Sequence, residues 1–230
     1  MNILVVGATG GTGRQTISEL SERGHKVTAF ARKTDRLDAD VGAARLVDGD
    51  ATDTEAVAGA IAGQDAVIVT LGISESPVRV RLRGPRATAP DVRSIGTIAV
   101  IEAMRRHDVR RLVVQSSYGV GESRDLLGLS DRMIFSLLLK PQIEDTERQE
   151  AAVRASGLDW VIVQPVHLTD RPATGATLVS TSNKVQTMRI TRRQVATVLA
   201  DAAEQSSSIR RTVAVSTATA TTSATPATPQ

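Results

Sequence analysis

Short apolar segments rich in β-branched residues alternate along this chain with longer segments whose apolar residues recur at helical spacing. The apolar segments predict strands at Asn2–Val6, Lys26–Phe30, Arg45–Val47, Asp65–Leu71, Arg111–Gln115 and Trp160–Gln164. The longer segments predict helices at Arg14–Arg23, Thr54–Ile61, Asp91–His107 and Gln142–Ala155. This alternation predicts one α/β domain, a doubly wound parallel sheet of about six or seven strands with helices on both faces and a short C-terminal cap.

The chain has 230 residues, which is enough for one domain and an additional tail. The strand and helix pattern occupies residues 1–215, which we expect to form the domain. Residues 216–230 are almost entirely Thr, Ala, Ser and Pro and carry no charge, so they predict a disordered tail. Ser74–Pro90 combines prolines with arginines and predicts an exposed basic loop, either a solvated insertion or a contact for phosphate or an acidic substrate.

Composition excludes several classes of function. The chain has no cysteine, which excludes a disulfide scaffold, a thiolate metal site and a cysteine nucleophile. Its three histidines are dispersed, so we expect no metal site. Aromatic residues make up 2% and the formal net charge is +3, which is typical of neither a base-stacking surface nor a general polyanion-binding surface. We therefore expect a small-molecule ligand and no nucleic-acid partner.

The distribution of apolar residues also argues against a membrane partner. No apolar run approaches the length that spans a bilayer. Met1 leads directly into a predicted strand, without the basic segment that opens a signal peptide. We therefore expect a cytoplasmic protein, either a monomer or a weak homodimer.

A glycine-rich segment, Gly7-Ala8-Thr9-Gly10-Gly11-Thr12-Gly13, follows the first predicted strand and opens the first predicted helix. Its G-x-x-G-x-x-G spacing lets the backbone turn tightly and approach a pyrophosphate, while amides at the helix N-terminus face the negative charge. Glycines also occur in ordinary turns, but the order of strand, loop and helix here is the one that dinucleotide binding requires. The segment therefore predicts a dinucleotide site on a Rossmann-like sheet.

The end of the second predicted strand indicates which dinucleotide binds. Arg32 and Lys33 end this strand, and Arg36 follows one helical turn later. Guanidinium groups suit the 2′-phosphate of NADP, whereas an acidic residue at this position would favour NAD. A solvated basic loop is the alternative, but the position favours NADP. Asp50, after the third predicted strand, is placed either to face the adenine side of the site or to cap the helix that begins near Asp53.

Several segments resemble the atypical short-chain dehydrogenase/reductase family, in particular the NmrA-like NAD(P)-binding oxidoreductases close to biliverdin IXβ reductase/flavin reductase. The similar segments are G-A-T-G-G-T-G at Gly7–Gly13, A-R-K-T-D-R-L at Ala31–Leu37, A-G-Q-D-A-V-I-V-T-L-G at Ala62–Gly72, S-G-L-D-W-V-I-V-Q-P at Ser156–Pro165 and V-H-L-T-D-R-P-A-T-G at Val166–Gly175. The last two segments are more specific than the glycine loop, because the fold alone does not demand them. Ser74–Pro90 and Gly121–Lys140 do not match, which leaves the substrate open.

The resemblance implies contacts to NADP from the glycine loop, the basic segment and the ends of the later strands. The implied residues are Gly7, Thr9, Gly10, Gly11, Thr12, Gly13, Arg32 and Arg36, then Asp50 and Ala51 near adenine, Leu71 and Gly72 beside the ribose, and Ser116, Ser117, Pro165, Val166 and His167 near the nicotinamide. The cofactor expected is NADP rather than NAD.

Ser117 and His167 are the candidate catalytic residues, because each stands at the C-terminal end of a predicted strand, where open α/β sheets bind ligands. Ser117 is placed to hydrogen-bond the nicotinamide amide or the substrate, and otherwise caps a turn. His167 titrates near neutral pH, and otherwise is a satisfied structural histidine. Tyr118 lacks the lysine of a Tyr-x-x-x-Lys pair, because Glu122 stands at that position and would repel a tyrosinate. We therefore expect Tyr118 to be part of the wall.

Two further features favour structural roles. The segment Glu144–Glu150 places Glu144 four residues before Arg148 on a predicted helix, which indicates a solvated and self-paired face. His25 and His107 stand at the ends of predicted helices, before strands and away from the ligand-binding edge of the sheet.

The residues and the resemblance together predict an NADPH-dependent oxidoreductase that transfers hydride to a small planar acceptor, such as a flavin, a quinone or a biliverdin-like tetrapyrrole. One alternative is a regulator that binds NADP(H) without turnover. Another alternative is an enzyme similar to nucleotide-sugar epimerases, although their usual tyrosine–lysine pair is absent from this sequence.

Overall fold

Strands and helices alternate as the sequence predicts in a computed structural model that describes residues 1–37, 42, 44–72, 89–121, 123, 140–205 and 209–219. The strands are β1 (Asn2–Val6), β2 (Lys26–Ala31), β3 (Ala44–Asp48), β4 (Ala66–Val69), β5 (Arg111–Gln115), β6 (Asp159–Pro165), β7 (His167–Thr169), β8 (Thr177–Ser180), β9 (Arg189–Thr191) and β10 (Arg211–Thr217). The helices are α1 (Gly11–Glu22), α2 (Thr54–Ile61), α4 (Val92–Arg106), α6 (Lys140–Arg154) and α7 (Arg192–Glu204), with a short 3-10 helix η1 (Thr34–Arg36).

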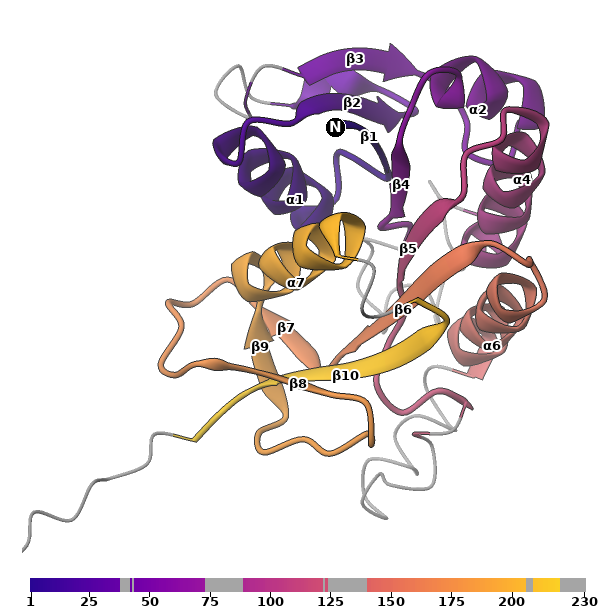
Figure 1. The fold of residues 1–230 in the computed structure, drawn as a ribbon. Helices are drawn as coiled ribbons and strands as arrows, with labels where there is room; N and C mark the ends of the chain where they lie inside the picture. The colour runs from indigo at the N-terminus through magenta and orange to yellow at the C-terminus, as the bar shows by residue number, and fades with distance from the viewer. Residues whose placement is uncertain are drawn as a thin grey trace, which may run out of the picture.

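The main sheet has eight strands in the order β3-β2-β1-β4-β5-β6-β10-β8 (Figure 1). Every neighbouring pair from β3 to β10 is parallel, and β8 runs antiparallel to β10 at the edge. The first six strands follow the doubly wound order, which reverses direction beside β1. The structure therefore confirms the predicted α/β, Rossmann-like fold. A separate small sheet pairs β7 with β9.

Successive side chains along a strand point to opposite faces of the sheet. In β1, Ile3 and Val5 pack in one cluster with residues of α1 and α7, whereas Leu4 and Val6 pack in a second cluster with residues of α2 and α4. All four side chains are fully buried. Figure 1 shows the corresponding layers, with α1 and α7 on one side of the sheet and α2, α4 and α6 on the other. A strand covered on both faces reads as a continuous apolar run, which is why N-I-L-V-V predicted β1.

The C-terminal part contains more structure than the short cap that the sequence pattern predicts. Helix α7 begins at a capping box, in which the hydroxyl of Thr191 accepts from the amide of Gln194 at 3.1 Å and the side chain of Gln194 accepts from the amide of Thr191 at 3.2 Å. Strand β10 continues to Thr217, and Ser216 is fully buried. These two residues therefore belong to the sheet rather than to a tail, because they pair with β8. Residues 220–230 lie outside the described part of the chain.

Two segments that the sequence singled out lie almost wholly outside the described residues. Only residues 89 and 90 of the basic loop Ser74–Pro90 are described, and few residues of Gly121–Lys140 are. Within the described ranges, no helix is long and apolar enough to cross a membrane. In the same ranges, His, Asp and Glu side chains form no group that could hold a metal ion.

Candidate functional site

The glycine loop turns from the end of β1 into α1 against the edge of the sheet. Gly7 has a φ of +88°, a left-handed conformation that glycine adopts without strain. The amides of Gly7 and Ala8 donate to the carbonyl oxygen of Phe30 at 3.1 and 3.2 Å. A Cβ atom on Gly13 would lie 2.4 Å from the carbonyl oxygen of Gly7. The glycines therefore let the loop and the helix approach more closely than any side chain permits.

A pocket of about 220 Å³ opens at this loop, and we call it the glycine-loop pocket. It is lined by Gly7, Thr9, Gly10, Gly11, Phe30, Ala31, Arg32, Arg36, Gly49, Asp50, Ala51, Thr70, Leu71, Gly72 and Val92. These residues follow β1, β2, β3 and β4, so the pocket lies at the carboxyl ends of the strands, where this fold binds ligands. Most of the predicted NADP contacts come together here. Thr12 and Gly13 do not line the pocket, because both are buried inside the first turn of α1.

The glycine-loop pocket suits an anionic dinucleotide. Among the described residues, no side chain caps the N-terminus of α1 at Gly10, which leaves the amides of its first turn available to a phosphate. Arg32 and Arg36 also line the pocket, and both are exposed. The close approach of Gly13 to Gly7 packs the start of α1 against the loop, so that the loop presents backbone to the pocket. The residues present therefore fit the cofactor that the sequence predicts.

Asp50 lines this pocket and does not cap α2. Its Oδ1 atom accepts from the amide of Thr52 at 2.9 Å and from the hydroxyl of Thr52 at 2.8 Å. These hydrogen bonds hold the pKa of Asp50 below its usual value, and the nearby Arg32 lowers it further. Asp53 is the N-cap of α2, where it accepts from two backbone amides at 3.0 and 3.2 Å. Of the two positions considered for Asp50, only the one at the pocket remains.

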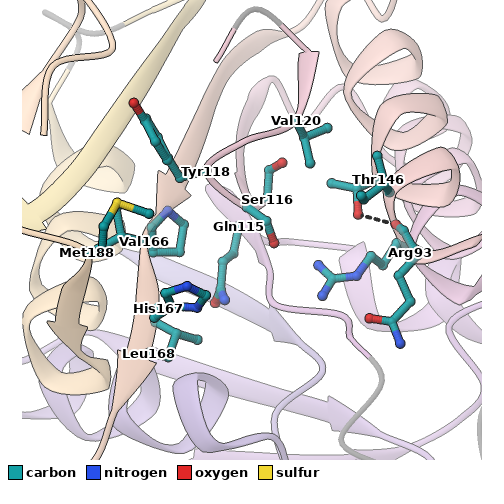
Figure 2. Close-up of a pocket in the computed structure, with 14 residues that line it drawn as sticks. Arg93, Gln115, Ser116, Tyr118, Val120, Thr146, Val166, His167, Leu168 and Met188 are labelled. Atoms are coloured by element: carbon teal, nitrogen blue, oxygen red, sulfur yellow. Dashed lines mark hydrogen bonds between the residues drawn. The ribbon is translucent and has the colours of Figure 1, made fainter. Parts of the chain in front are cut away.

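A second pocket of about 250 Å³ lies where β5 and β6 end, and we call it the β5–β6 pocket (Figure 2). It is lined by Arg93, Gln115, Ser116, Ser117, Tyr118, Val120, Gln142, Ile143, Thr146, Pro165, Val166, His167, Leu168 and Met188. The site residues predicted after β5 and β6 all lie here. Val92 lines the glycine-loop pocket and its neighbour Arg93 lines the β5–β6 pocket, so the two pockets adjoin at the first turn of α4.

Ser117 and His167 both present polar atoms to the β5–β6 pocket. Ser117 is half-buried, and His167 is the exposed first residue of β7. In the part of the chain that the structure describes, neither side chain has a hydrogen-bond partner. Figure 2 shows His167 on the opposite side of the pocket from Arg93. Within the described ranges, both candidate catalytic side chains are therefore available to a ligand.

Tyr118 lines the same pocket, but its hydroxyl group is hydrogen-bonded to the backbone. The hydroxyl donates to the carbonyl oxygen of Asn183 at 3.1 Å, and the residue is only 5% exposed. Burial raises the pKa of Tyr118 above its ordinary value, so the phenol stays neutral at physiological pH. This position matches the predicted wall role. Glu122, which the sequence places where an activating lysine would stand, lies outside the described residues.

A buried carboxylate of α6 connects the ends of β5 and β6. Glu150 is fully buried and accepts hydrogen bonds from the hydroxyl of Ser116 and, at 2.7 Å, from the side-chain amide of Gln164. Arg154 forms an ion pair with it at 2.8 Å. Ser116 lines the β5–β6 pocket as predicted. Its hydroxyl donates to Glu150, and this hydrogen bond holds the end of β5 in place.

The predicted solvated face of α6 is wrong for two of its carboxylates. Besides Glu150, Asp145 is buried, and it accepts from the amides of Arg93 and Ser94 at 3.1 Å each and from the hydroxyl of Ser94 at 2.5 Å. A carboxylate at this position stabilises the N-terminus of α4. Apart from Arg154 and Arg148 on the same helix, the partners of both carboxylates are distant in sequence, so the spacing within Glu144–Glu150 cannot reveal their burial.

Three polar residues near the pockets were missed by the sequence analysis. Arg93 and Gln115 line the β5–β6 pocket, and Arg192 of α7 lies against the glycine loop, where a Cβ atom on Gly11 would be 2.7 Å from its Nε atom. Arg192 also pairs with Asp170 at 2.7 Å. The position of Gln115, at the carboxyl end of a parallel strand and directly before two serines, was a signal that could have identified it.

Comparison with known proteins places this geometry among dinucleotide-binding proteins. A family model described as NAD(P)H-binding matches residues 7–206. A 3-diazoavenalumate denitrifying reductase from a Streptomyces species is 37% identical over 119 residues, which cover 50% of this chain and 38% of that reductase. The chain therefore spans well under half the length of that relative.

Solved structures share the fold over nearly the whole chain. A Rossmann-fold NAD(P)-binding family protein from Shigella flexneri has a TM-score of 0.71 and 25% identity, and the match covers 94% of this chain and 93% of that one. An anaerobilin reductase from Escherichia coli O157:H7 has a TM-score of 0.75 and 22% identity, with coverage of 99% and 100%. The second similarity is one of fold.

Proposed function

This chain belongs to the NAD(P)H-binding family, and from that premise we propose that it is an NADPH-dependent reductase which transfers hydride to a small planar acceptor such as a flavin, a quinone or a biliverdin-like tetrapyrrole. The observation that carries the proposal is the pair of adjoining pockets at the carboxyl ends of the strands. One pocket has the cradle and the cations of a dinucleotide site. The other presents the side chains of Ser117 and His167, which have no hydrogen-bond partner among the described residues.

In the glycine-loop pocket, the backbone amides of the first turn of α1, which begins at Gly11, would bind the pyrophosphate. Arg32 and Arg36 bind the 2′-phosphate, with charge and fork geometry that suit a phosphate monoester. Leu71 and Gly72 of this pocket would hold the ribose, and Pro165 and the residues after it in the β5–β6 pocket would hold the nicotinamide. When bound, NADPH supplies the hydride, and its oxidation to NADP⁺ provides the electron pair that reduces the acceptor.

In the β5–β6 pocket, the chain orients the acceptor and supplies hydrogen bonds. Ser117 and His167 donate to its polar atoms, because neither side chain is used elsewhere among the described residues. The proton that completes the reduction comes from water, or through the imidazole of His167, which lines the pocket. Tyr118 holds the wall through Asn183 and does not transfer the proton.

A panel of acceptors tests this function. NADPH oxidation is followed at the nicotinamide absorbance with flavins, quinones and biliverdin, with and without the protein. We expect protein-dependent oxidation with at least one planar acceptor, and a loss of about tenfold to a hundredfold for Ser117→Ala. Tight NADPH binding with no oxidation by any acceptor would contradict a reductase and favour a regulator that senses NADP(H).

The preference for NADPH over NADH is a separate expectation. One charge-assisted phosphate contact of about 1.4 kcal/mol makes NADPH bind at least about tenfold more tightly than NADH. The Arg32→Ala/Arg36→Ala variant should lose this difference and keep its affinity for NADH, as measured by fluorescence titration of both nucleotides. Lys33→Ala is the matched control, because Lys33 is also exposed but does not line the pocket. Equal affinities in the wild type would contradict the role of both arginines.

A further inference from the structure

Two buried polar atoms in the β5–β6 pocket have no hydrogen-bond partner in the described part of the chain. They are Nη1 of Arg93, a donor, and Oε1 of Gln115, an acceptor. Gln115 is 9% exposed, so water does not satisfy its amide in the way it satisfies a surface residue. Buried polar groups in native proteins are nearly always paired, because leaving one unpaired carries its full desolvation penalty. Both residues line the pocket, and a molecule bound there that accepts from Arg93 and donates to Gln115 would pair both groups.

The guanidinium of Arg93 is also not neutralised by an ion pair with any described carboxylate. The carboxylate of Asp145 favours the charged form of Arg93, but the oxygens of Asp145 accept from the backbone of Arg93 and from Ser94. Burial lowers the pKa of Arg93 while Asp145 raises it, and an arginine remains protonated under both influences. The other buried carboxylate beside the pocket, Glu150, is paired with Arg154. A positive charge that faces the cavity is thus left for a ligand to neutralise.

We propose that the acceptor carries an anionic group, a carboxylate or a phosphate, and that Arg93 binds it in the β5–β6 pocket while Gln115 accepts a hydrogen bond from the same molecule. This inference rests on the proposed reductase function. Figure 2 shows the Arg93 side chain extending into the pocket from the side of α4, with Gln115 and His167 across from it. An acceptor whose ring lies between them places its charged substituent against the guanidinium.

The anionic groups of NADPH itself do not account for Arg93. Its pyrophosphate and 2′-phosphate belong at the glycine loop and at Arg32 and Arg36, which line the other pocket. The nicotinamide end, which enters the β5–β6 pocket, carries no negative charge. Arg93 does stand near the boundary, because a Cβ atom on Gly72 would lie 3.1 Å from its Nη2 atom. The affinity for NADPH is therefore measured beside the acceptor kinetics.

The experiment compares acceptors that differ in one charged group. FMN is paired with riboflavin, which lacks the phosphate, and biliverdin is paired with its dimethyl ester, which lacks the carboxylates. We expect wild-type kcat/KM to favour the anionic member of at least one pair, and Arg93→Met to lower kcat/KM for that member by about 10- to 100-fold. The neutral member should change by less than about threefold, and Arg93→Lys should restore part of the difference. The pair that responds identifies phosphate or carboxylate as the recognised group.

Arg106→Met is the matched control, because Arg106 lies on the same helix and, among the described residues, pairs only with the exposed Glu55, at 2.6 Å. It should leave both members of each pair unchanged. Equal losses for anionic and neutral acceptors in Arg93→Met would overturn the proposal, as would a tenfold or greater rise in the Kd for NADPH. If no acceptor is reduced, the reductase function fails, and equilibrium binding of the same pairs to the NADP⁺ complex tests the subsite separately. Equal affinities within both pairs would then overturn it.

Discussion

Arg154→Met tests whether α6 carries a buried, compensated charge behind the β5–β6 pocket. The Glu150 side chain is 1% exposed and that of Arg154 is 33% exposed, with 2.8 Å between the paired atoms. Removing one partner of a buried ion pair costs about 3–5 kcal/mol, because the remaining charge is uncompensated. Water around Arg154 screens the pair, and the hydrogen bonds from Ser116 and Gln164 remain. We therefore expect the free energy of unfolding to fall by about 2–3 kcal/mol.

Thermal and urea unfolding measure this loss. In a domain of this size each kcal/mol shifts Tm by about 2–4 °C, so Arg154→Met should unfold about 4–12 °C below the wild type. The double variant Glu150→Gln/Arg154→Met removes both charges and should recover at least half of the loss. Arg106→Met, which breaks the exposed pair with Glu55, should change stability by less than about 1 kcal/mol. A wild-type Tm for Arg154→Met, or no recovery in the double variant, would refute the reasoning.

Three further predictions concern the pockets. Gly13→Ala places a Cβ atom where the carbonyl oxygen of Gly7 lies 2.4 Å away, so calorimetric titration should show that the Kd for NADPH rises at least tenfold. Ser117→Ala and His167→Ala should each lower turnover by about tenfold to a hundredfold with NADPH affinity nearly intact. Tyr118→Phe should change turnover little, and because burial raises the pKa of Tyr118, its ionisation should not reduce the rate at any pH below about 10. A loss above about a thousandfold for Tyr118→Phe alone would instead identify a dedicated general acid.

The N-terminal part of the fold could be read from the sequence because its signals are local. The strands β1, β2, β4, β5 and β6 are short apolar runs, since both of their faces are covered, and the bounds of β1 to β6 were predicted to within three residues. The glycine loop, Arg32 and Asp50 line one pocket because the strand that precedes each of them fixes its position at one edge of the sheet. Helix α1 begins three residues earlier than predicted, at Gly11, because the loop itself forms its first turn.

The C-terminal strands and the buried hydrogen bonds around Glu150 could not be predicted in the same way. Strands β7 and β9 have three residues each, too few to show a period, and β8 alternates little because it lies at the sheet edge. Helix α7 did carry a signal, the capping box from Thr191 to Gln194, which was not used. Glu150 was assigned to solvent because its burial depends on Ser116 and Gln164, which only the tertiary structure brings to it.

Anaerobic mixing of the protein with excess NADPH and an acceptor that the panel identifies tests the central claim most directly. We expect the amount of NADPH oxidised to equal the amount of acceptor reduced throughout many turnovers of each protein molecule. We also expect NADH to replace NADPH only at a much higher concentration. Binding of NADPH with no reduction of the acceptor beyond the protein-free rate would contradict the account.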